Sequence, residues 1–329
     1  MKLRQANLEH SDENIADQYP DLIDGLQKDS VQNANDARAT RKYAGWKVIF
    51  KYRKQTNTLT MEDFGTRGMN EEDWKKFWQG PWHTAKFGTS DAGQRGQGRY
   101  LFHYFSKNKT VLAESVDESG KYRFGWGLPD RYDDEEKTLE DFFPQMPKLD
   151  HPGTRLWVLD IKKELQKDLL DTERFARYIR ASWWEIIRNY QAVFVIDFDE
   201  TETLVAIPDF PPVKKERLYE SERIKNLGNV RKLILRFCEE DIPEEFRGIA
   251  VQRAGMTIRR LPVSAEESLR KKIYGYCNFD DELEANLRAC ELPNHMDFQN
   301  KRTWLYVSNS PRSHKPQQQA NLTRAILRR

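Results

Sequence analysis

The sequence predicts an α+β protein built in two parts. Its 329 residues exceed the roughly 250–300 that one hydrophobic core usually serves. Apolar spacing typical of helices is interspersed with runs typical of strands. Pro208, Pro211 and Pro212 separate a longer first part from a shorter second part. We expect an N-terminal segment at 1–18, a first domain at 19–210, a smaller α/β domain at 215–308 and a basic flexible tail at 309–329.

The composition favours a folded protein and excludes several classes. The 54 Lys and Arg residues nearly balance 52 Asp and Glu, and a net charge of +2 argues against a general nucleic-acid binder. Aromatic residues make up 12% of the chain and can fill a core. The longest apolar run, Ala192–Ile196, is far below the roughly 20 residues of a membrane helix. The three cysteines form no C-x-x-C pair, so we expect neither disulfides nor zinc, and a cytoplasmic location.

The first domain is expected to open with a helix that begins at Pro20. Small and apolar residues follow at three- and four-residue spacing, at Leu22, Leu26, Ser30, Ala34 and Ala37. Asp29, Asn33 and Asp36 share a different, polar face. Strands at Lys47–Arg53 and Thr58–Glu62 then form a hairpin.

A long loop at about 64–98 follows, rich in glycine and polar residues and partly helical, which we call the lid; loops of this length are usually functional. The rest of the first domain is expected to comprise helices at 99–106 and 172–188, an acidic excursion to Pro152, and strands at 111–115, 121–126, 154–161, 192–198 and 202–207. The second domain is expected to start near Glu216, with strands at 232–237 and 249–253 and a helix at 266–274.

Four short segments become informative when they are taken together and in order. They are Asp29 followed by Asn33-Ala34-Asn35-Asp36-Ala37; Asp63-Phe64-Gly65-Thr66-Arg67-Gly68-Met69; Gly93-Gln94-Arg95-Gly96-Gln97-Gly98; and Gly153-Thr154. This ordered set resembles the GHKL ATPases, which include gyrase B, the ninety-kilodalton heat-shock chaperone, MutL and the MORC proteins. The resemblance covers about residues 9–207.

The resemblance implies a Bergerat fold, a two-layer sandwich in which helices cover a mixed sheet, followed by a transducer-like α/β domain. It also implies a Mg²⁺-dependent ATPase that closes as a nucleotide-gated homodimer, with residues 1–18 available for exchange between subunits. Residues of the matching motifs are then expected to bind the nucleotide: Asn33, Asp36, Asp63, Gly65, Gly68, Met69, Gly93, Gly96, Gln97, Gly98 and Thr154.

The chemistry of these residue types supports such roles. The amide oxygen of Asn33 can ligate Mg²⁺, while Asp29, one helical turn earlier, addresses a water beyond the terminal phosphate as general base. Asp63, at a strand end, is an acceptor suited to the adenine amino group, and the resemblance adds Thr154 through water. Glycines at a helix N-terminus let backbone N–H groups meet phosphate oxygens.

Three cations are further candidates for phosphate contacts. Lys86 and Arg95 lie in the lid, and Arg253 ends a predicted strand of the second domain, in a strand and turn that resemble the segment where the transducer-bearing branches place a Lys or Arg. The alternative for Lys86 and Arg95 is that they are solvated loop cations, and the alternative for Arg253 is a surface or interdomain salt bridge.

Two departures from the family pattern leave the activity open. Asp29 stands where the chaperone, gyrase and MutL branches place Glu, and its side chain is about 1.5 Å shorter, which predicts slow hydrolysis. One extra residue separates Gly65 from Gly68. The alternatives are a non-hydrolysing ATP-binding scaffold in a larger complex and a chaperone-like ATPase. DNA or a protein is a possible further partner, and DNA maintenance, chromatin-like compaction and antiviral defence are all compatible processes.

Overall fold

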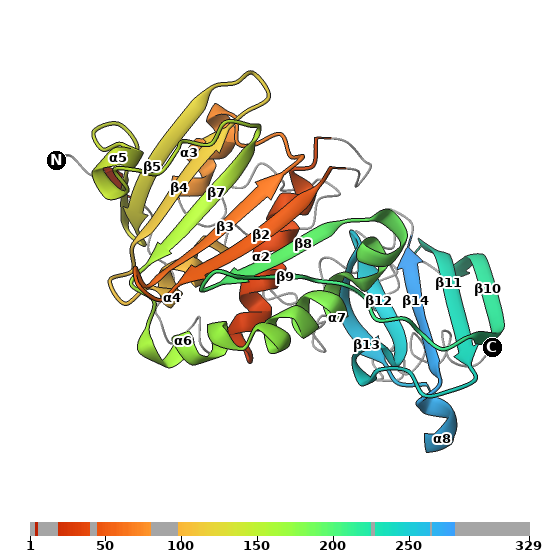
Figure 1. Cartoon of the computed structure of the whole chain (residues 1–329). Helices are drawn as coiled ribbons and strands as arrows, with labels where there is room; N and C mark the ends of the chain where they lie inside the picture. Colours follow the sequence, from red (N-terminus) through yellow and green to blue (C-terminus); the bar gives the residue numbers. More distant parts are fainter. Residues whose placement is uncertain are drawn as a thin grey trace, which may run out of the picture. The chain divides into compact units, whose positions relative to one another are not determined.

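The chain divides into two units, Met1–Ile207 and Pro208–Arg329. The computed structural model describes residues 4–5, 19–39, 45–79, 98–224, 228–263 and 265–279 (Figure 1). Helices and mixed sheets occur together, so the predicted α+β class is confirmed. Among the described helices, none is long and apolar enough to span a membrane.

The first unit is built on one mixed sheet. Its elements are β1 (Arg4–Gln5), α2 (Leu22–Asp36), β2 (Lys47–Arg53), β3 (Thr58–Phe64), α3 (Glu71–Gln79), α4 (Gly98–Phe105), β4 (Val111–Val116), β5 (Tyr122–Leu128), β6 (Arg131–Asp133), α5 (Leu139–Phe142), β7 (Gly153–Leu159), α6 (Lys163–Leu170), α7 (Thr172–Tyr190), β8 (Val193–Phe198) and β9 (Thr201–Leu204). The described strands follow the order β1-β6-β5-β4-β7-β3-β2-β8-β9. The β2–β8 pair is parallel, and the other described pairs of this sheet are antiparallel.

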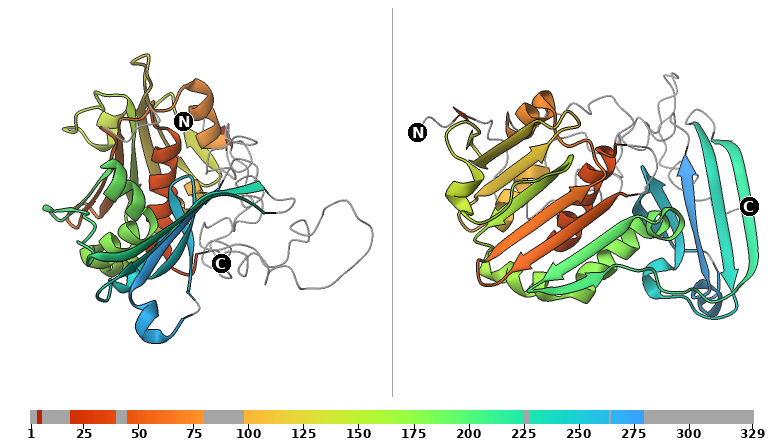
Figure 2. Two further views of the ribbon diagram at one scale, coloured as in Figure 1. Left: turned by 90° about the vertical axis from the view of Figure 1, so that its right-hand side faces the viewer. Right: turned by 45° about the horizontal axis from the view of Figure 1, so that its top comes forward.

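Helices α2 and α7 cover one face of this sheet, as Figures 1 and 2 show. Met61 of β3 and Phe50 of β2 are cross-strand partners and therefore point to the same face. The Ser30 hydroxyl of α2 lies 3.0 Å from the Met61 sulfur. The ring centroid of Phe175 in α7 lies 4.9 Å from that of Phe50, so both helices pack on one common face.

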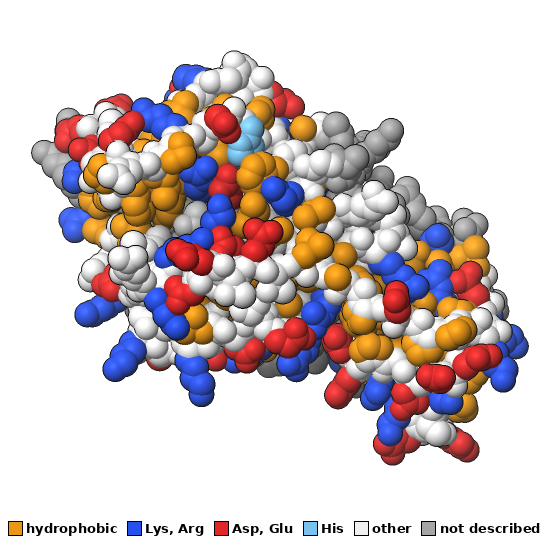
Figure 3. All heavy atoms as spheres, viewed as in Figure 1, with side chains coloured by type: hydrophobic (Ala, Val, Ile, Leu, Met, Phe, Trp, Pro, Cys, Tyr) orange, Lys and Arg blue, Asp and Glu red, His pale blue; other side chains and the backbone are white. Residues whose placement is uncertain are grey.

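The opposite face is covered only in part. Leu139 of α5 packs with Leu112, Phe124 and Trp157 in a buried cluster over β4, β5 and β7. The remainder of this face carries basic and acidic side chains interspersed with apolar ones (Figure 3). The sheet is therefore covered by helices on one face and is partly open on the other.

The second unit is a five-stranded sheet in its described part. It comprises β10 (Val213–Ile224), β11 (Gly228–Cys238), a 3₁₀ turn (Glu244–Phe246), β12 (Gly248–Arg253), β13 (Met256–Leu261), α8 (Glu267–Arg270) and β14 (Ile273–Phe279). The strand order is β10-β11-β14-β12-β13, with β12 and β14 parallel. Cys238 and Cys277 are buried.

Most elements predicted for the first unit are confirmed within one to three residues: the β2–β3 hairpin, α4, β4, β5, β7, α7, β8 and β9. The described start of the lid contains a helix, α3, in agreement with the partly helical character predicted for it. The first helix begins at Leu22 instead of Pro20, because the Asp21 carboxylate accepts the backbone N–H groups of Ile23 and Asp24 and so caps it. The predicted acidic excursion contains β6 and α5, and α6 was not predicted.

The predicted helix at 266–274 is wrong beyond Arg270. Helix α8 ends there, and Ile273–Phe279 forms β14, with Tyr274 and Tyr276 buried. This strand pairs with β11 on one side and β12 on the other. Pairing on both edges decides the conformation here, and it depends on segments distant in sequence.

Candidate functional site

The described parts of the segments singled out in the sequence meet around α2 and the end of β3. The chain after α2 runs alongside the chain after β3: Arg67 N–H donates to the Ala37 carbonyl at 2.8 Å, and Ala39 N–H donates to the Gly65 carbonyl at 3.1 Å. The C-terminal end of α2, which carries Asn33, is thereby joined to the end of β3, which carries Asp63.

Asp63 is held from two sides through one carboxylate oxygen. The Thr66 hydroxyl donates to Oδ1 at 2.5 Å, and the Thr154 backbone N–H donates to the same atom at 3.1 Å. Among the described residues, Oδ2 accepts no hydrogen bond. Burial raises the pKa of Asp63 to about 6, against the lowering effect of these donors. The side chain is thus a fixed acceptor with one oxygen available, and it is ionised above about pH 6.

The glycines of these segments permit close backbone approach. A Cβ on Gly153 would lie 2.5 Å from the Asp63 carbonyl oxygen, and one on Gly68 would lie 2.0 Å from the Val116 carbonyl oxygen. Gly68 also has a φ of +63°. Larger residues would separate β3 from β7 at Gly153 and the lid from β4 at Gly68.

Met69, at the start of the lid, is held through both of its backbone groups. Its N–H donates to the Ser115 hydroxyl at 2.8 Å, and its carbonyl accepts from Arg123 at 2.9 Å. The Ser115 hydroxyl in turn donates to the Gly153 carbonyl at 2.7 Å. Sequence analysis missed Ser115 and Arg123, and no local signal marks them, because they act from β4 and β5 through strand pairing.

His151 is a further residue to which the sequence analysis gave no role. Its ring stacks on Phe64 at 4.2 Å between centroids. Nδ1 lies 3.1 Å from an Asp150 carboxylate oxygen and Nε2 lies 3.3 Å from the Asp63 carbonyl oxygen. Both partners are acceptors, so only the doubly protonated ring can donate to both. His151 therefore supports the backbone carbonyl of Asp63 and does not lie on the face of the sheet that α2 and α7 cover.

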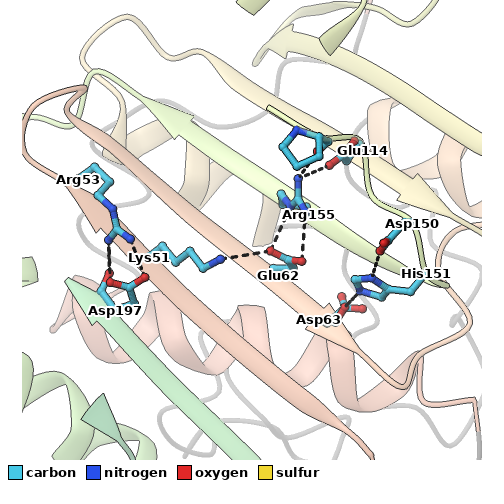
Figure 4. Close-up of polar contacts among 10 residues, drawn as sticks. Lys51, Arg53, Glu62, Asp63, Glu114, Asp150, His151, Arg155 and Asp197 are labelled. Atoms are coloured by element: carbon cyan, nitrogen blue, oxygen red, sulfur yellow. Dashed lines mark hydrogen bonds and ion pairs between the residues drawn. The ribbon is translucent and has the colours of Figure 1, made fainter. Parts of the chain in front are cut away.

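An ionic network fixes the register of β3 beside Asp63 (Figure 4). Arg155 of β7 bonds both oxygens of Glu62, at 3.1 and 3.2 Å, and forms an ion pair with Glu114 of β4 at 2.8 Å. Glu114 is fully buried, and burial raises its pKa. Because Glu62 precedes Asp63, this network on the open face holds the strand whose other face presents Asp63.

Asp29 lies in the middle of α2 and is 6% exposed. The Tyr19 hydroxyl donates to its Oδ2 at 2.7 Å. A Cβ built on Gly98, the first residue of α4, would lie 3.4 Å from the Asp29 carboxyl carbon. The third segment therefore reaches the first here, with the N-terminus of α4 beside the Asp29 carboxylate.

Asn33 and Asp36 differ from Asp29 in exposure. Asn33 is exposed, and Asp36, the last residue of α2, is half-buried. Groups of three or more His, Cys, Asp or Glu that could hold a metal are absent from the described residues. The exposed Asn33 amide fits Mg²⁺ nonetheless, since this ion usually keeps several waters and takes its remaining ligands from one or two protein groups and substrate phosphates.

The remaining predicted residues are placed as follows. Gly65 has a φ of +71° and connects β3 to the lid. Arg253 ends β12 in the second unit and is 2% exposed. The lid residues Lys86, Gly93, Arg95, Gly96 and Gln97 lie outside the described residues, as does the predicted tail at 309–329.

Buried Arg99, just after Gly98, fixes α4 to the end of α3. Its guanidinium donates to the Trp78 carbonyl, and burial lowers its pKa. The two described boundaries of the undescribed lid segment are thereby joined.

Comparison of the sequence with models of protein families and with curated proteins gives no match.

Proposed function

We propose that the first unit binds Mg²⁺-ATP in the manner of the GHKL ATPases, on a Bergerat fold, and hydrolyses it slowly. The observation that carries the proposal is Asp63, a buried carboxylate fixed through Oδ1 with Oδ2 available. An ionised acceptor at a strand end suits the exocyclic amino group of adenine, which needs an acceptor and offers two hydrogens. Thr154 lies beside it, in reach of a bridging water.

The phosphates are proposed to lie along α2 toward the N-terminus of α4. Backbone N–H groups at that helix end attract anions. Asn33 would hold Mg²⁺, which neutralises phosphate charge and orients the terminal phosphate. Asp29, one turn earlier, would take the proton of the attacking water.

Calorimetry with ATP and Mg²⁺ tests the base-recognition claim. Asp63→Asn should abolish binding, because the amide can present a donor where adenine needs an acceptor. Asp130→Asn, which removes a carboxylate from the β5–β6 turn, is the matched control and should bind like the parent. Undiminished affinity in Asp63→Asn would overturn the proposed role.

The wider mechanism we propose is a nucleotide-gated clamp, in which ATP stabilises a dimer with a closed lid. A ligand shifts such an equilibrium only by binding one state better. Light scattering with a non-hydrolysable ATP analogue should give about twice the monomer mass of 39.0 kDa, and deletion of residues 1–14 should weaken the dimer. A monomer with the analogue, or an equal dimer without it, would contradict the clamp.

The main alternative is a scaffold that binds ATP without useful hydrolysis. The short reach of Asp29 favours it, because misplacement of a base by about an ångström can cost roughly 100-fold in rate. ATP turnover with and without DNA or a co-purified protein decides between the two. The same measurement indicates which class of partner stimulates the protein.

A further inference from the structure

The Tyr19 ring packs against α2 at a position where only glycine leaves enough space for it. The ring lies over Gly25, where a Cβ would approach the Tyr19 Cδ1 atom to 2.3 Å. Gly25 sits inside the helix, and glycine there is less favourable than alanine by about 1 kcal/mol. The packed ring gives a physical reason for glycine at this position.

The hydroxyl of Tyr19 is directed by this packing. Gly25 and Asp29 are four residues apart and therefore neighbours on one helix face. A ring seated over Gly25 brings its oxygen to 2.7 Å from Asp29 Oδ2. Tyr19 is 3% exposed, and burial together with the Asp29 carboxylate raises its pKa well above its ordinary value. The phenol therefore stays protonated at neutral pH and donates to the carboxylate.

We infer that Tyr19 is a positioning residue for hydrolysis, which holds the Asp29 carboxylate in the orientation that a general base requires; this rests on the proposed function. Asp29 is one methylene shorter than glutamate, so any misdirection of its carboxylate adds to the limit that its short reach already sets. The bond from Tyr19 occupies Oδ2 and fixes the rotation of the carboxylate. Gly98, the first residue of α4, lies against the same carboxyl group. Tyr19 itself does not contact the reacting atoms.

Tyr19→Phe tests this role because it keeps the ring and removes only the hydroxyl. Hydrogen bonds to charged groups are worth more than neutral ones, so we expect kcat for ATP to fall about tenfold to a hundredfold. The KM and the calorimetric affinity for ATP should stay within about twofold. Loss of a purely structural contact would not lower kcat while leaving KM unchanged.

Tyr52→Phe is the matched control. Tyr52 is also buried, at 1% exposed, and its hydroxyl donates to Asn57 Oδ1 at 3.0 Å at the β2–β3 hairpin. Both variants should lose similar thermal stability, but Tyr52→Phe should keep the parental kcat.

Gly25→Ala is a second way to remove the hydrogen bond from Tyr19 to Asp29, because its methyl group must displace the Tyr19 ring. It should lower kcat like Tyr19→Phe, and the double variant should be no worse than either single one. Equal loss of kcat in Tyr52→Phe, or parental kcat in Tyr19→Phe, would overturn the inference. A parent that binds ATP but does not turn it over would also overturn it while leaving ATP binding intact. A parent that binds no ATP would overturn the proposed function itself.

Discussion

Helices α2 and α7 cover the same face of one sheet but bury different kinds of side chain. In α7, Phe175, Ile179 and Trp183 are fully buried; Phe175 packs against Phe50 of the sheet, and Trp183 donates to Gln27 of α2. In α2, six polar or charged residues are buried: Gln27, Lys28, Asp29, Ser30, Gln32 and Asn35. In the described part of α7, the buried polar residues are Ser182 and Glu185.

We interpret the difference as one between a structural helix and a helix that carries the proposed site. Burial of polar groups is unfavourable unless they are hydrogen-bonded, and it brings no hydrophobic stabilisation in return. Some of the α2 groups are satisfied by α7 itself, since Gln27 accepts from Trp183 at 3.0 Å. Asp29 instead accepts from the Tyr19 hydroxyl and lies beside the N-terminus of α4. We therefore expect variants of α2 to affect activity and variants of α7 to affect stability.

Asp29→Asn should have the largest effect on activity. Loss of a general base typically lowers a rate by about 10²–10⁴-fold. The amide retains the shape of the side chain and can still accept from Tyr19, so ATP binding should persist. Phosphate release under saturating ATP checks this result. Parental turnover would mean that the base is elsewhere.

Phe175→Ala should have the largest effect on stability. Its ring is fully buried between Phe50 and Phe198, and removing such a ring costs about 3–5 kcal/mol of unfolding free energy. Urea denaturation measures this loss. Arg177→Ala, at an exposed position of the same helix, should change stability by less than about 0.5 kcal/mol. A small loss in Phe175→Ala would show that α7 is not the structural helix.

Asp63 should make base binding depend on pH. Its pKa of about 6 means that the accepting, ionised form is depleted below that pH. Affinity for adenosine, which lacks phosphates that titrate nearby, should fall about tenfold from the plateau by pH 5. Titrations followed by NMR between pH 5 and 8 measure this. A flat profile would remove Asp63 from base recognition.

Ionisation of Asp63, which should favour adenosine binding, should lower the stability of the fold. The folded pKa of Asp63 is raised from its ordinary value of 3.8, so its stabilising contribution is present below about pH 4 and is lost as the pH rises through about 6. The shift of roughly two units corresponds to about 3 kcal/mol. The pH dependence of unfolding in the parent, compared with Asp63→Asn, isolates this contribution. The variant should become relatively more stable as the pH rises.

The smallest effects should come from the two helix caps. Asp21 caps α2 and also accepts from Arg174 of α7 at 2.6 Å, whereas Asp171 caps α7 through the Arg174 backbone N–H at 2.9 Å. Loss of a cap costs about 1 kcal/mol. In thermal melts, Asp21→Ala should therefore destabilise more than Asp171→Ala. Equal losses would show that the contact with Arg174 adds nothing.

Much of the first unit was predictable because its patterns are local. Three- and four-residue spacing marks α7, and the alternation around Lys54–Asn57 marks the β2–β3 hairpin. The ordered glycines and acids led to Asp29 and Asp63 without knowledge of their contacts. The glycines of these segments mark backbone constraints that are visible in the sequence, such as the close approach at Gly153.

The supporting residues of the site were not predictable from local patterns. Tyr19, Ser115 and His151 act through contacts 10, 46 and 88 residues away along the chain. Strand β14 was missed for the same reason, since pairing with β11 and β12 decides its conformation. Such contacts depend on the completed topology.

Hydrogen–deuterium exchange of the full chain, with and without Mg²⁺ and a non-hydrolysable ATP analogue, tests the contrast between the two helices most directly. Exchange slows where a ligand stabilises local structure. We expect protection in peptides covering the C-terminal half of α2, residues 63–69 and residues 153–155, and unchanged exchange in peptides of α7. Unaltered exchange at residues 63–69, or protection confined to α7, would contradict the assignment of the nucleotide site to α2.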